Sequence, residues 1–169
     1  MRKVVLFTAS SLDGFIATKG GGIDWLFTDG DYGYKRFFNS IDATLTGFKT
    51  YKKALSFGEF AFSGKANYVF SRKKRRPDHN VTFVSRNIPA FVQKLKKEKS
   101  KKNIWLVGGG ILNSLLLNAG LIDEMIISYH PVILGNGIPL FTDKSRESEF
   151  TLVRQKLYPS GLVQITYKK

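Results

Sequence analysis

The chain has 169 residues, of which 43% are hydrophobic and 14% aromatic, so it can bury a sizeable core and is not disordered. It has no cysteine and only two histidines, His79 and His130, which excludes disulfides and thiolate metal sites and argues against an imidazole metal site. The formal net charge of +14 is concentrated in residues 72–76 (RKKRR) and 94–102 (KLKKEKSKK), which fits a polyanion-binding patch and equally a solvated helix face and a basic loop. We expect one domain over residues 1–169.

The first half of the chain alternates apolar runs with glycine-rich or helical segments. Residues 3–9 (KVVLFTA) are typical of a buried strand, and residues 10–26 predict a long loop that touches the core at Phe15 and Ile16. A short helix is expected at 32–40, a strand at 43–47 and a second helix at 50–55.

The second half continues this alternation and ends in a hairpin. We expect strands at 66–71, 81–85, 104–107 and from 124 to a stop at Pro131, a helix with its lysines in solvent from residue 88, and a helix over 111–120. The run IWLV lacks polar alternation, which indicates a central parallel strand. After a loop at 135–141, residues 150–158 and 162–169 predict an antiparallel pair. The fold class is therefore α/β, with a mostly parallel sheet and an antiparallel edge.

Unusual residues follow four of these strands, at the edge where such sheets bind ligands. They are Ala9-Ser10, Gly47 before Lys49-Thr50, Ser71-Arg72, and Gly108-Gly109-Gly110. The three glycines fit either a tight strand-to-helix turn or a backbone that approaches a phosphate at a helix N-terminus. Together the four strand ends indicate a site for an extended diphosphate ligand.

The order of the motifs SLDGFIA, GGIDWL, DATLTGFKTY, YVFSR, IWLVGGG and PVILGNGIPLF resembles the dihydrofolate reductase superfamily. The last motif is closest to the branch with the reductase domain of riboflavin biosynthesis. The resemblance implies a three-layer α/β/α fold, often dimeric, that binds NADPH. It also implies hydride transfer to a pyrimidine- or pteridine-like ring, such as 5-amino-6-(5-phosphoribosylamino)uracil or dihydrofolate.

The resemblance also implies roles for individual residues. Ala9 and Ile16 match positions that flank the nicotinamide, and Ser71 with Arg72 matches the 2′-phosphate site. The first phosphate turn and the diphosphate loop are matched by Gly47, Lys49, Thr50, Gly108, Gly109, Gly110, Ile111 and Leu112. Asp31 falls on the carboxylate that assists protonation, although Asp24 and Asp29 stay open as alternatives, and Ser128 falls near its supporting hydroxyl. Trp25 is either core filler or an aromatic lid over the substrate.

One departure is Phe48, which stands where the family usually has a phosphate-contacting arginine. Lys49 or the cluster at 72–76 could compensate, or the cluster could be a solvated loop. For a phosphorylated substrate, Lys35, Arg36 or Lys52 could supply an anion site. We expect His130 to pack at a strand end and His79 to have no role.

Two other functions stay open: a nucleic-acid-binding domain that uses the basic clusters, and a family member that has lost catalysis. Aromatic residues are not interleaved with the basic runs, which argues against the first. With no N-terminal signal pattern, the sequence is typical of a cytoplasmic protein, and the resemblance implies a homodimer.

Overall fold

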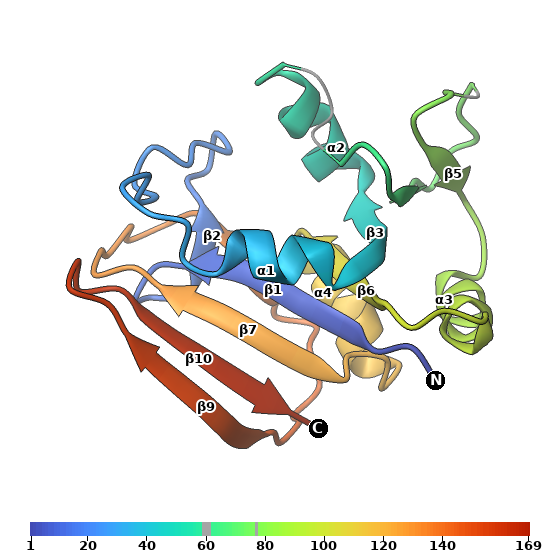
Figure 1. The fold of residues 1–169 in the computed structure, drawn as a ribbon. Helices are drawn as coiled ribbons and strands as arrows, with labels where there is room; N and C mark the ends of the chain where they lie inside the picture. Colours follow the sequence, from blue (N-terminus) through green and yellow to red (C-terminus); the bar gives the residue numbers. More distant parts are fainter. Residues whose placement is uncertain (59–61, 77) are drawn as a thin grey trace.

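A computed structural model describes all residues except 59–61 and 77, and its centre is an eight-stranded sheet with the order β5-β4-β3-β6-β1-β7-β10-β9 (Figure 1). Its strands are β1 (Val4–Ser10), β3 (Ile41–Gly47), β4 (Ala66–Phe70), β5 (Thr82–Val84), β6 (Asn103–Gly108), β7 (Glu124–Tyr129), β9 (Thr151–Leu157) and β10 (Val163–Lys168). Neighbouring strands from β5 to β7 pair in parallel, whereas β10 pairs antiparallel with both β7 and β9. The predicted mostly parallel sheet with an antiparallel edge is confirmed.

Four helices complete the layers in the described part of the chain. Helix α1 (Tyr34–Asn39) crosses one face of the sheet in front of β1, and α4 (Gly110–Asn118) lies on the opposite face (Figure 1). The other two helices are α2 (Phe48–Leu55) and α3 (Ile88–Lys97). As expected, α3 buries Val92 and Leu95 and exposes Lys94 and Lys97. No described helix has the length and apolar character needed to cross a bilayer.

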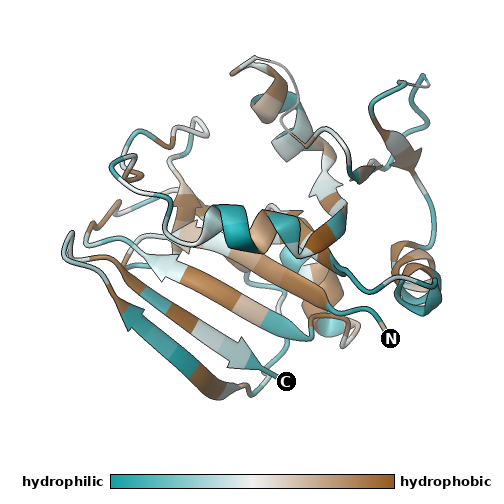
Figure 2. Ribbon diagram, viewed as in Figure 1, coloured by the Kyte–Doolittle hydropathy of each residue, from teal (hydrophilic) through white to brown (hydrophobic). Residues whose placement is uncertain are grey.

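The core lies where β1, β6 and β7 run between α1 and α4. These strands are the apolar centre of the ribbon in Figure 2. The main cluster includes Leu6, Leu45 and Leu106 from the central strands and Leu116 from α4, all fully buried. On the α1 side, Trp105 packs edge-on against Phe37, with ring centroids 5.4 Å apart. Burial on both faces explains why IWLV carries no polar alternation.

Strands β1 and β6 separate toward their carboxyl ends. Their pairing stops at Leu6 and Leu106, whereas β1 stays paired with β7 as far as Ser10. The carbonyl of Lys3 accepts from the N–H of Ile104 on β6, and the backbone of a strand points to alternate sides. The backbone of Ala9 therefore faces the β6 side beyond the point where pairing ends.

A small second sheet lies within two segments that we predicted to be loops. Strand β2 (Phe15–Ala17) pairs antiparallel with β8 (Ile138–Pro139). Each strand is three residues or fewer and preceded by a glycine, so neither leaves a periodic pattern in the sequence. The loop prediction was wrong at these residues, although Phe15 and Ile16 are partly buried as expected.

Candidate functional site

A cavity of about 350 Å³ lies at the carboxyl ends of β1 and β7, beneath the segment that leads into α1. This volume is at the lower end of the range of small-molecule sites. The lining residues are Phe7, Thr8, Ala9, Leu26, Phe27, Gly30, Asp31, Tyr32, Tyr34, Ser128, His130 and Leu162. The cavity thus brings together three residues that were selected from the sequence: Ala9, Asp31 and Ser128.

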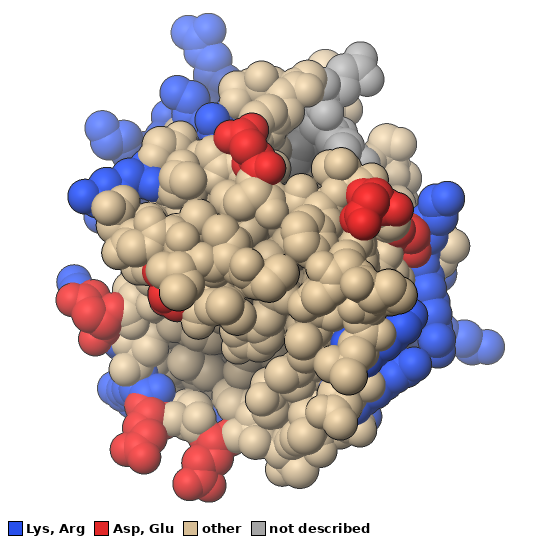
Figure 3. All heavy atoms as spheres, turned by 90° about the vertical axis from the view of Figure 1, so that its left-hand side faces the viewer, with Lys and Arg blue, Asp and Glu red and all other residues tan. Residues whose placement is uncertain are grey.

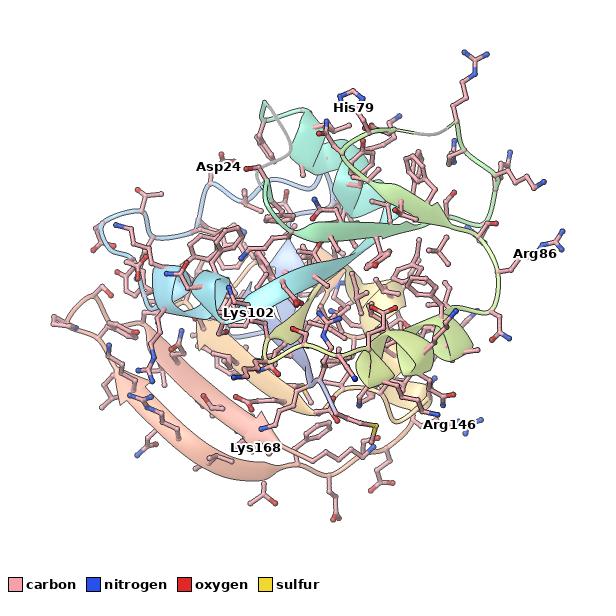
Figure 4. All side chains as sticks on the ribbon, turned by 45° about the vertical axis from the view of Figure 1, so that its right-hand side comes forward. Asp24, His79, Arg86, Lys102, Arg146 and Lys168 are labelled. Atoms are coloured by element: carbon pink, nitrogen blue, oxygen red, sulfur yellow. The ribbon has the colours of Figure 1, made fainter. Side chains whose placement is uncertain are left out.

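Asp31 is the carboxylate, among the three candidates, that lines this cavity. Its Oδ1 accepts a hydrogen bond from the backbone N–H of Lys35 (3.1 Å), so it also supports the start of α1. Asp29 instead accepts from the hydroxyl of Tyr32 (2.5 Å), and this bond raises the pKa of the Tyr32 phenol. Asp24 is exposed on the outer loop (Figure 4).

Ser128 is 7% exposed, and its partner is Gln164 rather than a carboxylate. The Nε2 group of Gln164 on β10 donates to Ser128 Oγ and to the backbone oxygen of Tyr32, at 3.0 Å each. Gln164 therefore ties the cavity wall on β7 to the loop before α1. Because Ser128 Oγ accepts this bond, its own hydrogen is free to donate into the cavity.

His130 lines the same cavity, a role that the sequence did not indicate. It is 4% exposed, and its ring contacts Phe27 and Trp25 with centroids 4.9 Å and 5.2 Å apart. Burial lowers the pKa of the imidazole, and a hydrogen bond from Nδ1 to the Ser128 carbonyl (3.2 Å) opposes this only in part. His130 packs at a strand end, as expected. Only the fold reveals that it also faces a cavity.

Trp25 lies next to the cavity wall and not in it. Its ring meets His130 at 89°, and its Nε1 is buried without a hydrogen-bond partner. Trp25 would act as a lid only if its loop closed over the cavity. Its predicted contact with substrate therefore stays a prediction.

A glycine turn forms the neighbouring part of the site, at the carboxyl ends of β3 and β6. The N–H of Gly109 donates to Thr50 Oγ1 on α2 (3.1 Å). A Cβ on Gly47 would lie 3.4 Å from the Gly108 oxygen, and one on Gly109 would lie 3.8 Å from Cδ1 of Ile16. The fold thus brings together five of the predicted cofactor residues, from three separate stretches of the chain.

The glycines of this turn also have packing roles. Gly108 has φ +94°, and a Cβ there would lie 2.6 Å from Asn113 Oδ1. A Cβ on Gly110 would lie 2.3 Å from the carbonyl oxygen of Pro139 in β8. The peptide bond between Gly108 and Gly109 is cis. The turn interpretation of the three glycines is therefore correct, and phosphate contact stays a prediction beside it.

The N-terminus of α4 leaves some of its amides available. Leu112 N–H donates to the Gly109 carbonyl (2.9 Å), and its side chain is 5% exposed in the core. Gly110 and Ile111 precede it in the first turn, where N–H groups lack intrahelical partners, and Ile111 is 67% exposed. At α2, Lys49 is exposed in the first turn beside Thr50.

Arg75 lies against the residue that departs from the family pattern. Its guanidinium carbon is 3.7 Å from the centroid of the Phe48 ring, and its Nε donates to Ser71 Oγ (3.0 Å). Stacking and this bond fix the guanidinium plane and leave its two terminal nitrogens to bind an anion. Arg72, which was predicted with Ser71 to bind the 2′-phosphate, is exposed, and so is Arg75.

The described residues contain no cluster of three or more side chains that could hold a metal ion. The donor set fits a dinucleotide better. It combines helix N-terminal amides, a threonine hydroxyl, an immobilised guanidinium and, in the gap beside β6, the backbone of Ala9.

The fold and this two-part site define a small α/β protein of the dihydrofolate reductase type. The chain belongs to the RibD C-terminal domain family, whose model matches residues 2–164. Its relatives include the uncharacterized protein YyaP of Bacillus subtilis, 38% identical over 98% of this chain and 94% of that one. Membership in this family indicates a reductase-like enzyme.

Two solved structures share this fold. A Shewanella sp. PV-4 protein, provisionally named as a riboflavin biosynthesis protein, superposes with a TM-score of 0.86 at 29% identity over 99% of this chain and 98% of that one. A dihydrofolate reductase of Enterococcus faecalis complexed with NADP(H) has a TM-score of 0.73 at 12% identity, over 98% and 95% of the two chains. The second likeness is one of fold alone.

Proposed function

We propose that this protein is an NADPH-dependent reductase that transfers a hydride to a pyrimidine- or pteridine-like ring. The observation that carries the proposal is the adjacency of the cavity and the glycine turn. Ala9 lines the cavity, and its backbone faces the gap between β1 and β6. Across that gap, the turn at Gly108 and Gly109 contacts Thr50 and Ile16. A ring held in the gap would adjoin the cavity, while its phosphates would reach the turn.

Each half of the site would have its own task. Thr50 and the first amides of α4 would bind the diphosphate, and Arg75 with Ser71 would bind the 2′-phosphate. NADPH, when bound, supplies the hydride. Asp31 would hold or relay a proton at the ring acceptor through its free oxygen, and Ser128 Oγ would donate a hydrogen bond. Phe7 and Phe27 would exclude water from the cavity.

The test is a fluorescence titration with NADPH and NADH, because Trp25 and Trp105 lie near the site. Trp105 Nε1 donates to the Phe7 carbonyl (2.9 Å), close to where β1 and β6 separate. We expect saturable binding of both nucleotides, with NADPH bound at least tenfold more tightly. A Thr50→Val variant should weaken both, whereas Thr151→Val on the exposed strand β9 should change neither. No saturable binding of NADPH would sink the proposal.

A dimer is supported by the edge of the sheet. All seven residues of β9 are exposed, among them Leu152, Val153 and Leu157. An open apolar edge strand is a pairing surface unless it is covered. Sedimentation should give a dimer that Leu152→Asp with Leu157→Asp dissociates, and a monomeric parent protein would count against it.

A further inference from the structure

The hydrogen-bonding state of His130 is fixed by its surroundings. Nδ1 lies 3.2 Å from the carbonyl oxygen of Ser128, which can only accept, so Nδ1 carries the proton. In the neutral ring, Nε2 is then a lone-pair acceptor. No hydrogen bond in the described part of the chain uses Nε2. His130 thus presents an unused acceptor at the wall of the cavity.

The other polar groups of the cavity are mostly used, and those that remain form a defined set. Tyr32 donates to Asp29 and Gln164 donates to Ser128, which leaves the second oxygen of Asp31, the hydroxyl hydrogen of Ser128 and the hydroxyl of Tyr34. With Nε2 of His130, the described lining residues offer two acceptors, one donor and, at Tyr34, a hydroxyl that can do either. A ligand that matches them carries N–H groups and an acceptor atom.

The cavity has no positive charge of its own. No lysine or arginine is among its described lining residues, whereas Asp31 is. Figure 3 shows the face at the carboxyl ends of β1 and β7 as broad, mostly uncharged surface with a few Asp or Glu side chains on it, and with Lys and Arg at its edges. Lys35 follows Asp31 in the chain, but its side chain is exposed and it contributes a backbone N–H. A phosphate placed here would meet a carboxylate without a counter-charge.

We propose that the cavity binds a planar heterocycle that carries ring or exocyclic N–H groups and no phosphate or carboxylate, and that Nε2 of His130 accepts one of these N–H bonds. This inference rests on the proposed reductase function and narrows its substrate class. The proposed ligand class excludes phosphoribosyl compounds, because a phosphate in the cavity would require a cation there. The aromatic walls Phe7, Phe27 and Tyr34 suit a flat ring.

The test uses two fluorescent probes that differ by one phosphate: neopterin and neopterin monophosphate. Each is titrated into the full chain saturated with NADP⁺, and binding is followed by anisotropy of the pteridine. We expect neopterin to bind at least tenfold more tightly than its monophosphate.

Three variants connect the selectivity to His130. Phenylalanine preserves a planar ring against Trp25 and Phe27 but lacks the acceptor, so His130→Phe should weaken neopterin binding at least tenfold. His130→Gln can place an amide oxygen near Nε2 and should restore part of it. The matched control is His79→Gln, at an exposed position near α2 (Figure 4), which should leave neopterin binding unchanged. NADPH affinity and the melting temperature, measured for each variant, separate a binding role from a merely structural one.

Each outcome is decisive. Equal or tighter binding of the monophosphate overturns the inference, and loss of that binding in Lys35→Met would assign the phosphate to the cavity rim. If neither pteridine binds while NADPH does, the ligand class is wrong and the reductase proposal stands. If NADPH also fails to bind, the proposed function itself has failed. Unchanged neopterin binding in His130→Phe overturns the role of His130.

Discussion

Two regions at the same edge of one sheet have opposite chemistry. The cavity at the ends of β1 and β7 is walled by aromatic rings, a carboxylate and a neutral imidazole. The turn at the ends of β3 and β6 is made of glycine backbone, with Thr50 and Arg75 close by. The gap where β1 separates from β6 lies between these two adjacent regions. The contrast is consistent with our proposals that an anion binds beside the glycines and that an uncharged ring binds in the cavity.

The largest effect is expected where the turn is packed most tightly. Gly110→Ala would place a Cβ 2.3 Å from the Pro139 oxygen, which is backbone and cannot move aside. Overpacking of this kind costs about 1–3 kcal/mol of the free energy of unfolding. Denaturant unfolding measures it, and Gly20→Ala is the control because nothing lies within 4 Å of its Cβ. Equal stability of both variants would show that β8 yields at this contact.

Removal of the Arg75 side chain, which stacks on Phe48, should weaken NADPH binding at the glycine turn. A hydrogen bond to a charged group contributes about 1.5–3 kcal/mol, so Arg75→Ala should raise the Kd for NADPH roughly 10- to 100-fold. The Kd for NADH should hardly change. Calorimetric titrations with both nucleotides give the ratio, and Arg76→Ala is the matched control.

A double variant sharpens this result. Phe48 stands at the position where the family usually has an arginine. If Arg75 takes over the role of that arginine, then Phe48→Arg in the Arg75→Ala background should restore part of the preference for NADPH over NADH. Preference that is lost and not restored would mean that Arg75 acts only by packing on Phe48.

A smaller effect concerns the pH dependence of stability. Burial lowers the pKa of His130 below its ordinary value of 6.5, so the unfolded state binds a proton first as the pH falls. The stability that neutral His130 provides is complete above pH 6.5 and is lost as the pH falls from 6.5 toward its folded pKa. Compared with His130→Phe in chemical unfolding between pH 8 and 5, the parent protein should lose more stability. If the free energy of unfolding of the two proteins changed equally with pH, the lowered pKa of His130 would be contradicted.

The smallest effect is expected far from the contrast, on α3. Lys94 and Lys97 are exposed, and changes at such sites usually alter stability by less than about 0.5 kcal/mol. Lys94→Gln with Lys97→Gln should therefore leave stability and NADPH binding unchanged. A loss of salt-dependent binding to single-stranded DNA in this variant would instead favour the nucleic-acid hypothesis.

Much of the fold could be predicted because each signal was local. The unbroken apolar run at 104–107 depends on neighbours within one strand. The three-residue spacing of Val92 and Leu95 likewise depends on neighbours within one helix. Strands β2 and β8 could not be predicted, because three residues or fewer have no period and their pairing depends on a partner more than 100 residues away.

The candidate site divides in the same way. Sequence alone determined which residues follow the strands, and so selected the glycines. Asp31 and Ser128 were selected because the order of motifs along the chain resembles a family. Tertiary structure decided that His130 faces a cavity, that Arg75 rather than Arg72 lies against Ser71, and that Gln164 holds Ser128. These contacts join residues by side-chain direction across separate strands and loops, and direction in space is a property that linear order does not encode.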